Sequence, residues 1–179
     1  MKWPIVFLDI DGVLNDGIDP KAQEGSVLAL NYITRSTAAA IVVHSSWRYT
    51  LSLEGLRGAL LAMGVAGRVL DVCDTPRHQA MPDDCSRIII SGPDLAEWQA
   101  GAPSDHERAV AIWRWLRDHP EYDPGERFVI LDDDPCLGHY VGTEHFICTQ
   151  ATWPDSDAVR DGLTRAHSWR AVKVLEGRR

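Results

Sequence analysis

The chain has 179 residues, 45% of them apolar and 25% charged, which is enough for one globular domain with a substantial core. Its formal net charge of −8 argues against broad electrostatic binding to nucleic acid, although it leaves binding of a single terminal phosphate open. No apolar run has the length of a membrane span, and residues 1–9 lack the basic-then-apolar pattern of a secretory signal. We therefore expect no membrane attachment and a cytoplasmic location.

The four cysteines are scattered and include no C-x-x-C pair. A zinc site built from Cys73, His78 and Cys85 matches no common ligand spacing and lacks an evident fourth ligand. A disulfide between Cys73 and Cys85 is not expected in a reducing compartment. The cysteines therefore predict neither a zinc centre nor a disulfide.

The first strand is predicted by the apolar residues 5–8, and two acids follow it at Asp9 and Asp11. We expect the strand to end at Asp9, with Gly12 allowing the backbone to curl so that both acids meet at the carboxyl end. In open α/β sheets ligands bind at that edge. Two close carboxylates repel unless a cation or a proton relieves them, and Mg²⁺ prefers hard oxygen ligands. This segment therefore predicts a magnesium site.

A second apolar run, residues 128–131, ends in the three acids Asp132, Asp133 and Asp134. Alone, these acids could equally form a turn that begins the next helix. Together with Asp9 and Asp11 they favour one cation shared by two acid-tipped strands.

The other elements are expected to alternate along one domain, residues 1–179. In order, they are helix 23–36, strand 39–44, helix 51–63, strand 68–72, a loop-rich insertion or small lid at 73–103, a helix that starts at 104, strand 145–149 and helix from about 155. This alternation is typical of a parallel α/β sheet.

Three features support the predicted helices. Gly64 would end the second helix, and Ser104 with Glu107 would form a capping box at the start of the third. The residues expected to face the core are Val27, Leu30 and Ile33 in the first helix, Leu53, Leu56, Leu60 and Met63 in the second, and Ala109, Ile112, Trp113 and Leu116 in the third.

The sequence DIDGV at residues 9–13 resembles the first motif of the haloacid dehalogenase-like (HAD) phosphohydrolase superfamily. The apolar run 40–44 ending in Ser45 resembles its second motif, Arg108 at the start of a helix its third, and Asp132 with Asp133 its fourth. The superfamily usually has lysine at the third motif, but the three lysines here lie outside the interval between the second and fourth motifs. An arginine can bind two phosphate oxygens at once, so this replacement is chemically reasonable.

Three further segments resemble one branch of that superfamily: SSWR at 45–48, WL at 115–116 and GLT at 162–164. The branch is the small HAD domain associated with RNA-repair and polynucleotide kinase-phosphatase-like proteins. The resemblance implies a Rossmann-like, doubly wound parallel sheet without a large cap.

The resemblance also implies a two-step phosphoryl transfer with Mg²⁺ as cofactor. Asp9 would attack phosphorus and form an aspartyl-phosphate, while Asp11 would act as general acid and then general base. Asp9, the backbone carbonyl of Asp11 and Asp132 would bind the metal, and Asp133 would support its coordination shell. Because we expect Asp9 near the surface, Asp9→Asn should abolish hydrolysis without unfolding the protein.

Phosphate binding is assigned to Ser45 and Arg108 as catalytic groups, with Gly12, Ser46 and Arg48 as substrate-binding candidates. For Ser45 the alternative is a helix N-cap, and for Arg108 and Arg48 it is an exposed arginine without a catalytic role.

Two aromatic and two imidazole side chains have weaker assignments. Trp47 and Trp98 could stack on a base, although partly buried packing is the more common role of such residues. His44 is interpreted as a packing residue at a strand end, and His139 is left unassigned.

Only 36 positions separate Asp9 from Ser45, which leaves room for a flap and one helix but not for a full cap domain. An open site favours a phosphate on a large molecule, such as a nucleotide or a nucleic-acid end. A small-metabolite phosphatase and a non-catalytic phosphate-binding domain remain the alternatives, and the oligomeric state is open.

Overall fold

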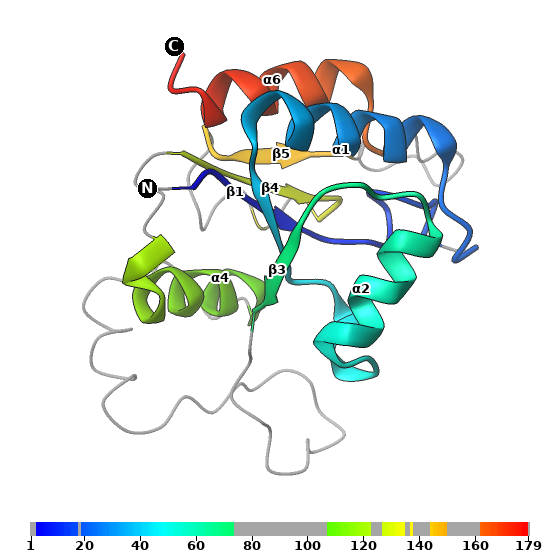
Figure 1. The fold of residues 1–179 in the computed structure, drawn as a ribbon. Coiled ribbons are helices and arrows are strands. Elements are labelled where there is room, and N and C mark those ends of the chain that lie inside the picture. The colour runs from blue at the N-terminus through cyan, green and yellow to red at the C-terminus, as the bar shows by residue number, and fades with distance from the viewer. Residues whose placement is uncertain are drawn as a thin grey trace.

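The computed structural model describes residues 3–17, 19–73, 107–122, 127–134, 137, 144–149 and 162–178. Its centre is a five-stranded, fully parallel sheet in the order β3-β2-β1-β4-β5. The strands are β1 (Ile5–Leu8), β2 (Ala40–Val43), β3 (Val69–Val72), β4 (Phe128–Asp132) and β5 (Phe146–Cys148). The predicted α/β fold with a parallel sheet is confirmed (Figure 1).

The order of the strands contains one reversal. The chain moves outward from β1 to β2 and β3, and then returns to place β4 on the other side of β1. Leu8 of β1 pairs with Leu131 of β4, so Asp9 and Asp132 follow at the same level. Ligands of open α/β sheets bind at such a reversal, outside the carboxyl ends of the strands. The register therefore brings the two acid-tipped strands together.

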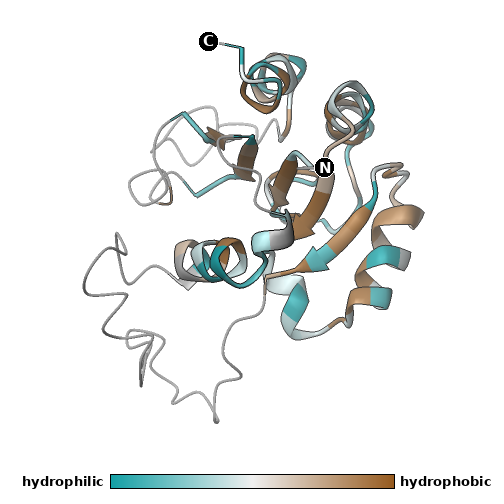
Figure 2. Cartoon of the chain, turned by 60° about the vertical axis from the view of Figure 1, so that its left-hand side comes forward, coloured by the Kyte–Doolittle hydropathy of each residue, from teal (hydrophilic) through white to brown (hydrophobic). Residues whose placement is uncertain are grey.

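Helices cover both faces of the sheet, as Figures 1 and 2 show. They are α1 (Glu24–Thr37), α2 (Leu53–Ala62), α4 (Glu107–Asp118) and α6 (Arg165–Leu175), with the short 3₁₀ helices η1 (Ser46–Tyr49) and η2 (Pro120–Tyr122). Helices α1, α2 and α6 pack with Val6, Leu8 and the odd-numbered positions of β2 in one apolar cluster. Helix α4 packs against Ile5 and Phe7 on the opposite face. Alternate strand residues face opposite sides, so β1 is buried on both.

The sequence predicted α1 and α2 well. Val27, Leu30 and Ile33 of α1 are buried, as are Leu56 and Leu60 of α2, whereas Leu53 and Met63 are only partly buried. Gly64 follows α2 with a φ of +91°, which agrees with its predicted role in ending the helix.

The buried side of α4 needs a correction. Ala109 and Ile112 are buried as expected, but Trp115 is the buried tryptophan, while Trp113 is half-buried and Leu116 only partly so. The ring of Trp115 meets Phe7 edge-on at 5.5 Å between centroids. Its indole nitrogen donates to Asp71, so both the ring and its polar atom have partners inside the fold.

Several predictions concern residues outside the described ranges. They are the insertion or lid at 73–103 beyond Cys73, the capping box at 104–107 as a whole, helical structure at 155–161, and the assignments of His78, Cys85, Trp98 and His139. Within the described part of the chain, Cys73 and Cys148 form no disulfide. None of the helices there combines the length and apolar character that crossing a bilayer requires.

Candidate active site

One guanidinium connects the two acid-tipped strands. Nη1 of Arg108, in the first turn of α4, donates to Asp9 Oδ2 at 2.7 Å and to the two carboxylate oxygens of Asp132 at 2.9 and 2.8 Å. Asp9 is 1% exposed and Asp132 0%, whereas the side chain of Arg108 is 26% exposed. The sequence analysis expected Asp9 near the surface, and this expectation is wrong because the residue is buried. Its β1 neighbours are fully buried, and Arg108 covers its carboxylate.

Burial and mutual repulsion favour the protonated forms of these acids. Desolvation is the largest cause that raises the pKa of Asp9, and the nearby Arg108 opposes it. Desolvation and the charge of Asp9 raise the pKa of Asp132 from 3.8 to about 7. Burial disfavours the charged form of Arg108, but the two carboxylates outweigh it and raise its pKa. When both are ionised, Asp9 and Asp132 thus carry two negative charges, and Arg108 compensates only one of them.

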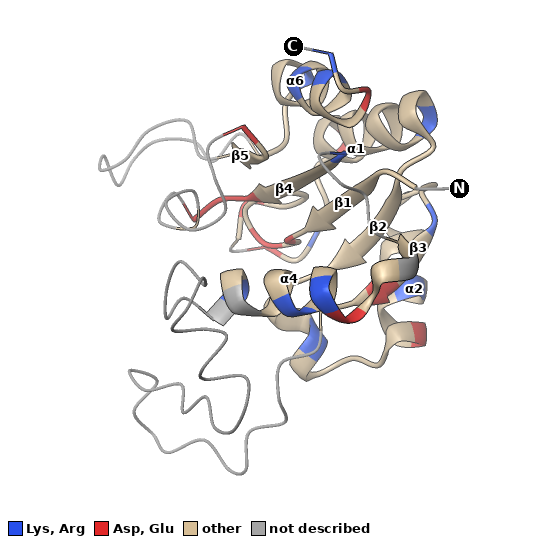
Figure 3. Ribbon diagram, turned by 90° about the vertical axis from the view of Figure 1, so that its left-hand side faces the viewer, with Lys and Arg blue, Asp and Glu red and all other residues tan. Residues whose placement is uncertain are grey.

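A third acid completes a possible metal site. One carboxylate oxygen from each of Asp9, Asp132 and Asp133 lies within 4.8 Å of the others. An all-carboxylate donor set is hard and suits Mg²⁺, so the residues present fit the predicted cofactor. Figure 3 shows acidic residues beyond the ends of β1 and β4.

Gly12 makes room for Asp133. It has a φ of +74°, and a Cβ built there would lie 2.2 Å from Asp133 Oδ2. Thr149, at the end of β5, donates from its hydroxyl to the carbonyl of Gly12 at 2.9 Å, which fixes the turn. Gly12 therefore has a direct structural role beside the acids, and nothing in the structure tests its predicted contact with substrate.

Asp11 is oriented by two donors. The indole Nε1 of Trp47 donates to its Oδ2 at 2.8 Å, and the amide of Asn15 donates to its Oδ1 at 2.9 Å. The carboxylate of Asp11 does not belong to the acid cluster found among the described residues. This is consistent with the expectation that only its backbone carbonyl would serve the metal.

Ser45 lies at the end of β2, beside the acids. It is fully buried, and its side chain makes a hydrogen bond with Asp9. The same side chain is the N-cap of η1, accepting from the amide of Trp47 at 3.5 Å. The N-cap interpretation of Ser45 is therefore confirmed, and its predicted contact with phosphate stays a prediction.

Arg48 and Ser46 occupy the turn that follows. Nη1 of Arg48 donates to the backbone carbonyls of His44 and Ser45, the latter at 3.0 Å, and Nη2 donates to Tyr49. These bonds support the turn that carries Ser45. Ser46 is exposed at the start of η1.

The sequence analysis missed four residues of the site. It did not predict that Asn15 and Trp47 would hold Asp11, or that Thr149 would bond to Gly12. It gave His44 only a packing role. His44 is fully buried with Nδ1 3.6 Å from Asp132 Oδ2. Asn15 could have been found, since an Asn four residues after Asp11 in a glycine turn is a typical side-chain cap. The other three depend on contacts between distant segments.

Comparison with known proteins agrees with this geometry. No curated protein and no solved structure matches the chain. Residues 5–153 match the family described as the HAD domain in Swiss Army Knife RNA repair proteins. This match covers most of the chain and all four motif positions, in agreement with the resemblance stated above. The chain belongs to the HAD domain family of Swiss Army Knife RNA repair proteins.

Proposed function

We propose that this protein is a Mg²⁺-dependent phosphatase that acts through an aspartyl-phosphate on Asp9. The observation that carries the proposal is the meeting of Asp9, Asp132 and Arg108 at the reversal of strand order. Membership of a HAD family points to phosphatase-type activity, and the acid cluster fits a metal site.

Asp9 is the nucleophile in this proposal. Its Oδ1 accepts from the amide of Ile10 at 2.8 Å, which fixes the carboxylate and leaves Oδ2 directed at Arg108. The substrate phosphate would replace Asp9 as the acceptor of the Arg108 hydrogen bond. The guanidinium would then neutralise the phosphate oxygens next to Asp9 Oδ2, the attacking atom. Ser45, whose hydroxyl is hydrogen-bonded to Asp9, would redirect its single donor from Asp9 to the same phosphoryl group.

The cofactor would be held by Asp9, Asp132 and the carbonyl of Asp11, with Asp133 beside them. Bound there, Mg²⁺ supplies positive charge that offsets repulsion between the carboxylates and the phosphate. Arg108 supplies only one positive charge to Asp9, Asp132 and Asp133, so these residues have capacity for a divalent ion.

Asp11 is the proton carrier. Trp47 and Asn15 hold its two oxygens, so the carboxyl group keeps one orientation while it gives a proton to the leaving oxygen and later accepts one from water. Only an oriented carboxyl can serve both steps, because each requires the proton to lie close to the same reacting oxygen.

The favoured substrate is the terminal phosphate of a nucleotide or nucleic acid. The family description, which refers to RNA repair, supports this choice. The net charge of −8 favours the second candidate, a small-metabolite phosphatase of the same mechanism. A cytoplasmic location is also proposed.

The test measures phosphate release from 3′- and 5′-phosphorylated oligonucleotides, mononucleotides and a metabolite panel, with Mg²⁺ and with EDTA. We expect Mg²⁺-dependent release that Asp9→Asn abolishes and the matched control Asp19→Asn, an exposed acid in the following loop, preserves. Turnover of metabolites alone would overturn the nucleic-acid proposal. Full activity of Asp9→Asn would overturn the mechanism.

A further inference from the structure

We propose that the outer side of α6 is a docking surface for single-stranded RNA, distinct from the acid cluster that would bind the terminal phosphate. The first observation is charge. Residues 162–179 contain five Lys and Arg and one Glu, a net charge of +4 within a chain of −8. The argument against nucleic-acid binding, made for the chain as a whole, does not hold on this helix.

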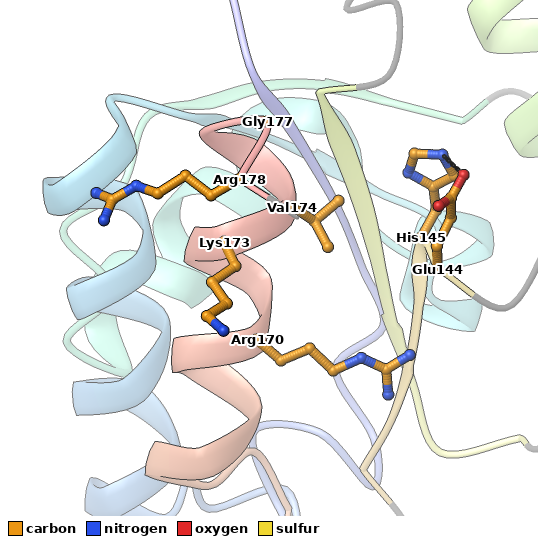
Figure 4. A pocket seen from close by; sticks show the side chains of 7 residues that line it. All are labelled: Glu144, His145, Arg170, Lys173, Val174, Gly177 and Arg178. Atoms are coloured by element: carbon orange, nitrogen blue, oxygen red, sulfur yellow. Dashed lines mark ion pairs between the residues drawn. The ribbon is translucent and has the colours of Figure 1, made fainter.

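Three cationic side chains of this segment line one pocket, with the charged ends of Arg170 and Arg178 pointing to different sides of α6 (Figure 4). The pocket has a volume of about 280 Å³ and lies between α6 and the start of β5. Arg170, Lys173 and Arg178 line it together with Glu144 and His145 (Figure 4). Glu144 pairs with His145 at 3.5 Å, and Arg178 pairs with Glu176. The lining thus has three cationic side chains and one acidic side chain, a composition that suits phosphate groups.

The opposite flank of α6 is aromatic. A groove of about 390 Å³ runs between α1 and α6 and is lined by Tyr32, Trp169 and Leu28. These side chains are 47%, 56% and 61% exposed and adjoin one another along the groove. The guanidinium of Arg165 lies 5.3 Å from the ring centre of Trp169. Cations that follow a backbone, next to aromatic rings on which bases stack, are the two elements of single-strand recognition.

Helix α6 connects this surface to the acids. The amide of Leu163, just before the helix, donates to the carbonyl of Val13 in the loop that follows Asp11, at 2.8 Å. At its other end, Arg127 Nε donates to the carbonyl of Leu175 near the start of β4. The 11 residues of α6 thus lead from the acid-bearing edge of the sheet to the opposite edge, a distance of about 16 Å. A strand whose end lies at Asp9 can follow this helix.

The choice of RNA over a protein partner comes from the combination of features. A second copy of the chain would place two segments of net charge +4 against each other, which is unfavourable. A membrane surface would use the cations but not an aromatic groove on the other flank. A polyanion with stacking bases would use both the cationic pocket and the aromatic groove. The inference rests on the proposed function only for the position of the terminal phosphate at Asp9.

Fluorescence anisotropy with a labelled single-stranded RNA tests the surface. The RNA ends in hydroxyl groups, so that the acid cluster does not contribute. We expect Arg170→Ala/Lys173→Ala to weaken binding and to lower the slope of log affinity against log salt by about 1.4, which corresponds to two phosphate contacts on a single strand. Trp169→Ala should weaken binding about fivefold or more. Arg68→Ala, an exposed cation beside β3 at the far edge of the sheet, is the matched control and should bind as the wild type does.

A second measurement separates this proposal from the proposed function. Hydrolysis of p-nitrophenyl phosphate should be unchanged in both α6 variants, while KM for a phosphorylated oligonucleotide should rise in the double variant and in Trp169→Ala. RNA binding unaffected by these substitutions would overturn the docking surface, whether or not the enzyme hydrolyses phosphate. Dimerisation in sedimentation experiments that Trp169→Ala abolishes would also overturn it, because the groove would then bind a second copy.

Discussion

Arg108 and Asp9 are 99 residues apart in sequence, yet Nη1 of the arginine lies 2.7 Å from Oδ2 of the aspartate. The same nitrogen bonds Asp132, so one cation compensates two buried carboxylates. Without that cation the carboxylates would repel at close range. This relationship leads to a direct test of whether Arg108 and Mg²⁺ compensate the same carboxylates.

Replacing Arg108 with Met should destabilise the metal-free protein by about 3 kcal/mol, because the partners of a buried ion pair lose their countercharge. Mg²⁺ should then raise the melting temperature of the variant more than that of the wild type, since no side chain competes for the carboxylates. Thermal melting with EDTA and with Mg²⁺ measures both effects.

Arg108→Lys is the control for that experiment. It keeps one positive charge and should retain part of the metal-free stability, although it loses the planar donor geometry. Equal Mg²⁺-induced shifts in wild type and Arg108→Met would show that Arg108 and the metal do not share these carboxylates.

Gly12→Ala should displace Asp133 and weaken Mg²⁺ binding at least tenfold by calorimetry. The added Cβ meets Asp133 Oδ2 at 2.2 Å, and φ at this position is +74°. We also expect a loss of stability of about 1 kcal/mol or more from the backbone strain. Gly58→Ala is the matched control: its Cβ meets nothing within 4 Å inside α2, so it should be neutral or stabilising by up to about 1 kcal/mol. Unchanged Mg²⁺ affinity in Gly12→Ala would contradict a role for Asp133 at the metal.

Trp47→Phe removes one donor to Asp11 and keeps an aromatic ring. We expect kcat to fall about tenfold and the pH–rate profile to move, while KM changes little, because the substitution affects the orientation of a proton carrier. Trp115→Phe is a matched control, since it removes a similar indole bond, to Asp71 at 2.7 Å, on the other face of the sheet. A Trp47→Phe profile that overlays the wild type would exclude the positioning role.

The pH dependence of stability follows from Asp132. Its pKa is raised to about 7 by burial and by the charge of Asp9, whereas the unfolded chain loses this proton near 3.8. A raised pKa contributes stability that is complete below about 4 and is lost as pH rises toward 7. Thermal melting in EDTA should therefore show the metal-free protein becoming less stable between pH 5 and pH 7. Asp132→Asn should flatten this slope, and an unchanged slope in that variant would assign the effect to other groups.

The sequence predicted the parts of this protein that depend on local pattern. Apolar runs identified the strands, and Asp9, Asp11, Asp132 and Asp133 stood out because acids directly after buried strands have few structural uses. Arg108 could be proposed from the resemblance and from the absence of lysine in the interval. Its bridge between two carboxylates depends on the register of β1 against β4, which local pattern does not contain.

The errors have physical causes as well. On α4, Trp113 was expected to be buried in place of Trp115, two residues further on. The two side chains are equally apolar, and the contact with Phe7 that favours Trp115 comes from a distant strand. Asp9 was expected near the surface because a charged side chain usually is. Its burial follows from its neighbours in three dimensions, Ser45 and Arg108.

The central claim is best tested by finding the covalent intermediate. The protein is mixed with Mg²⁺ and a phosphorylated oligonucleotide, quenched in acid within the first turnover, and its peptides are analysed by mass spectrometry. The account predicts a phosphoryl group on the peptide that contains Asp9 in the wild type and none in Asp9→Asn. Turnover with the phosphoryl group on another residue, or equal turnover in Asp9→Asn, would contradict it.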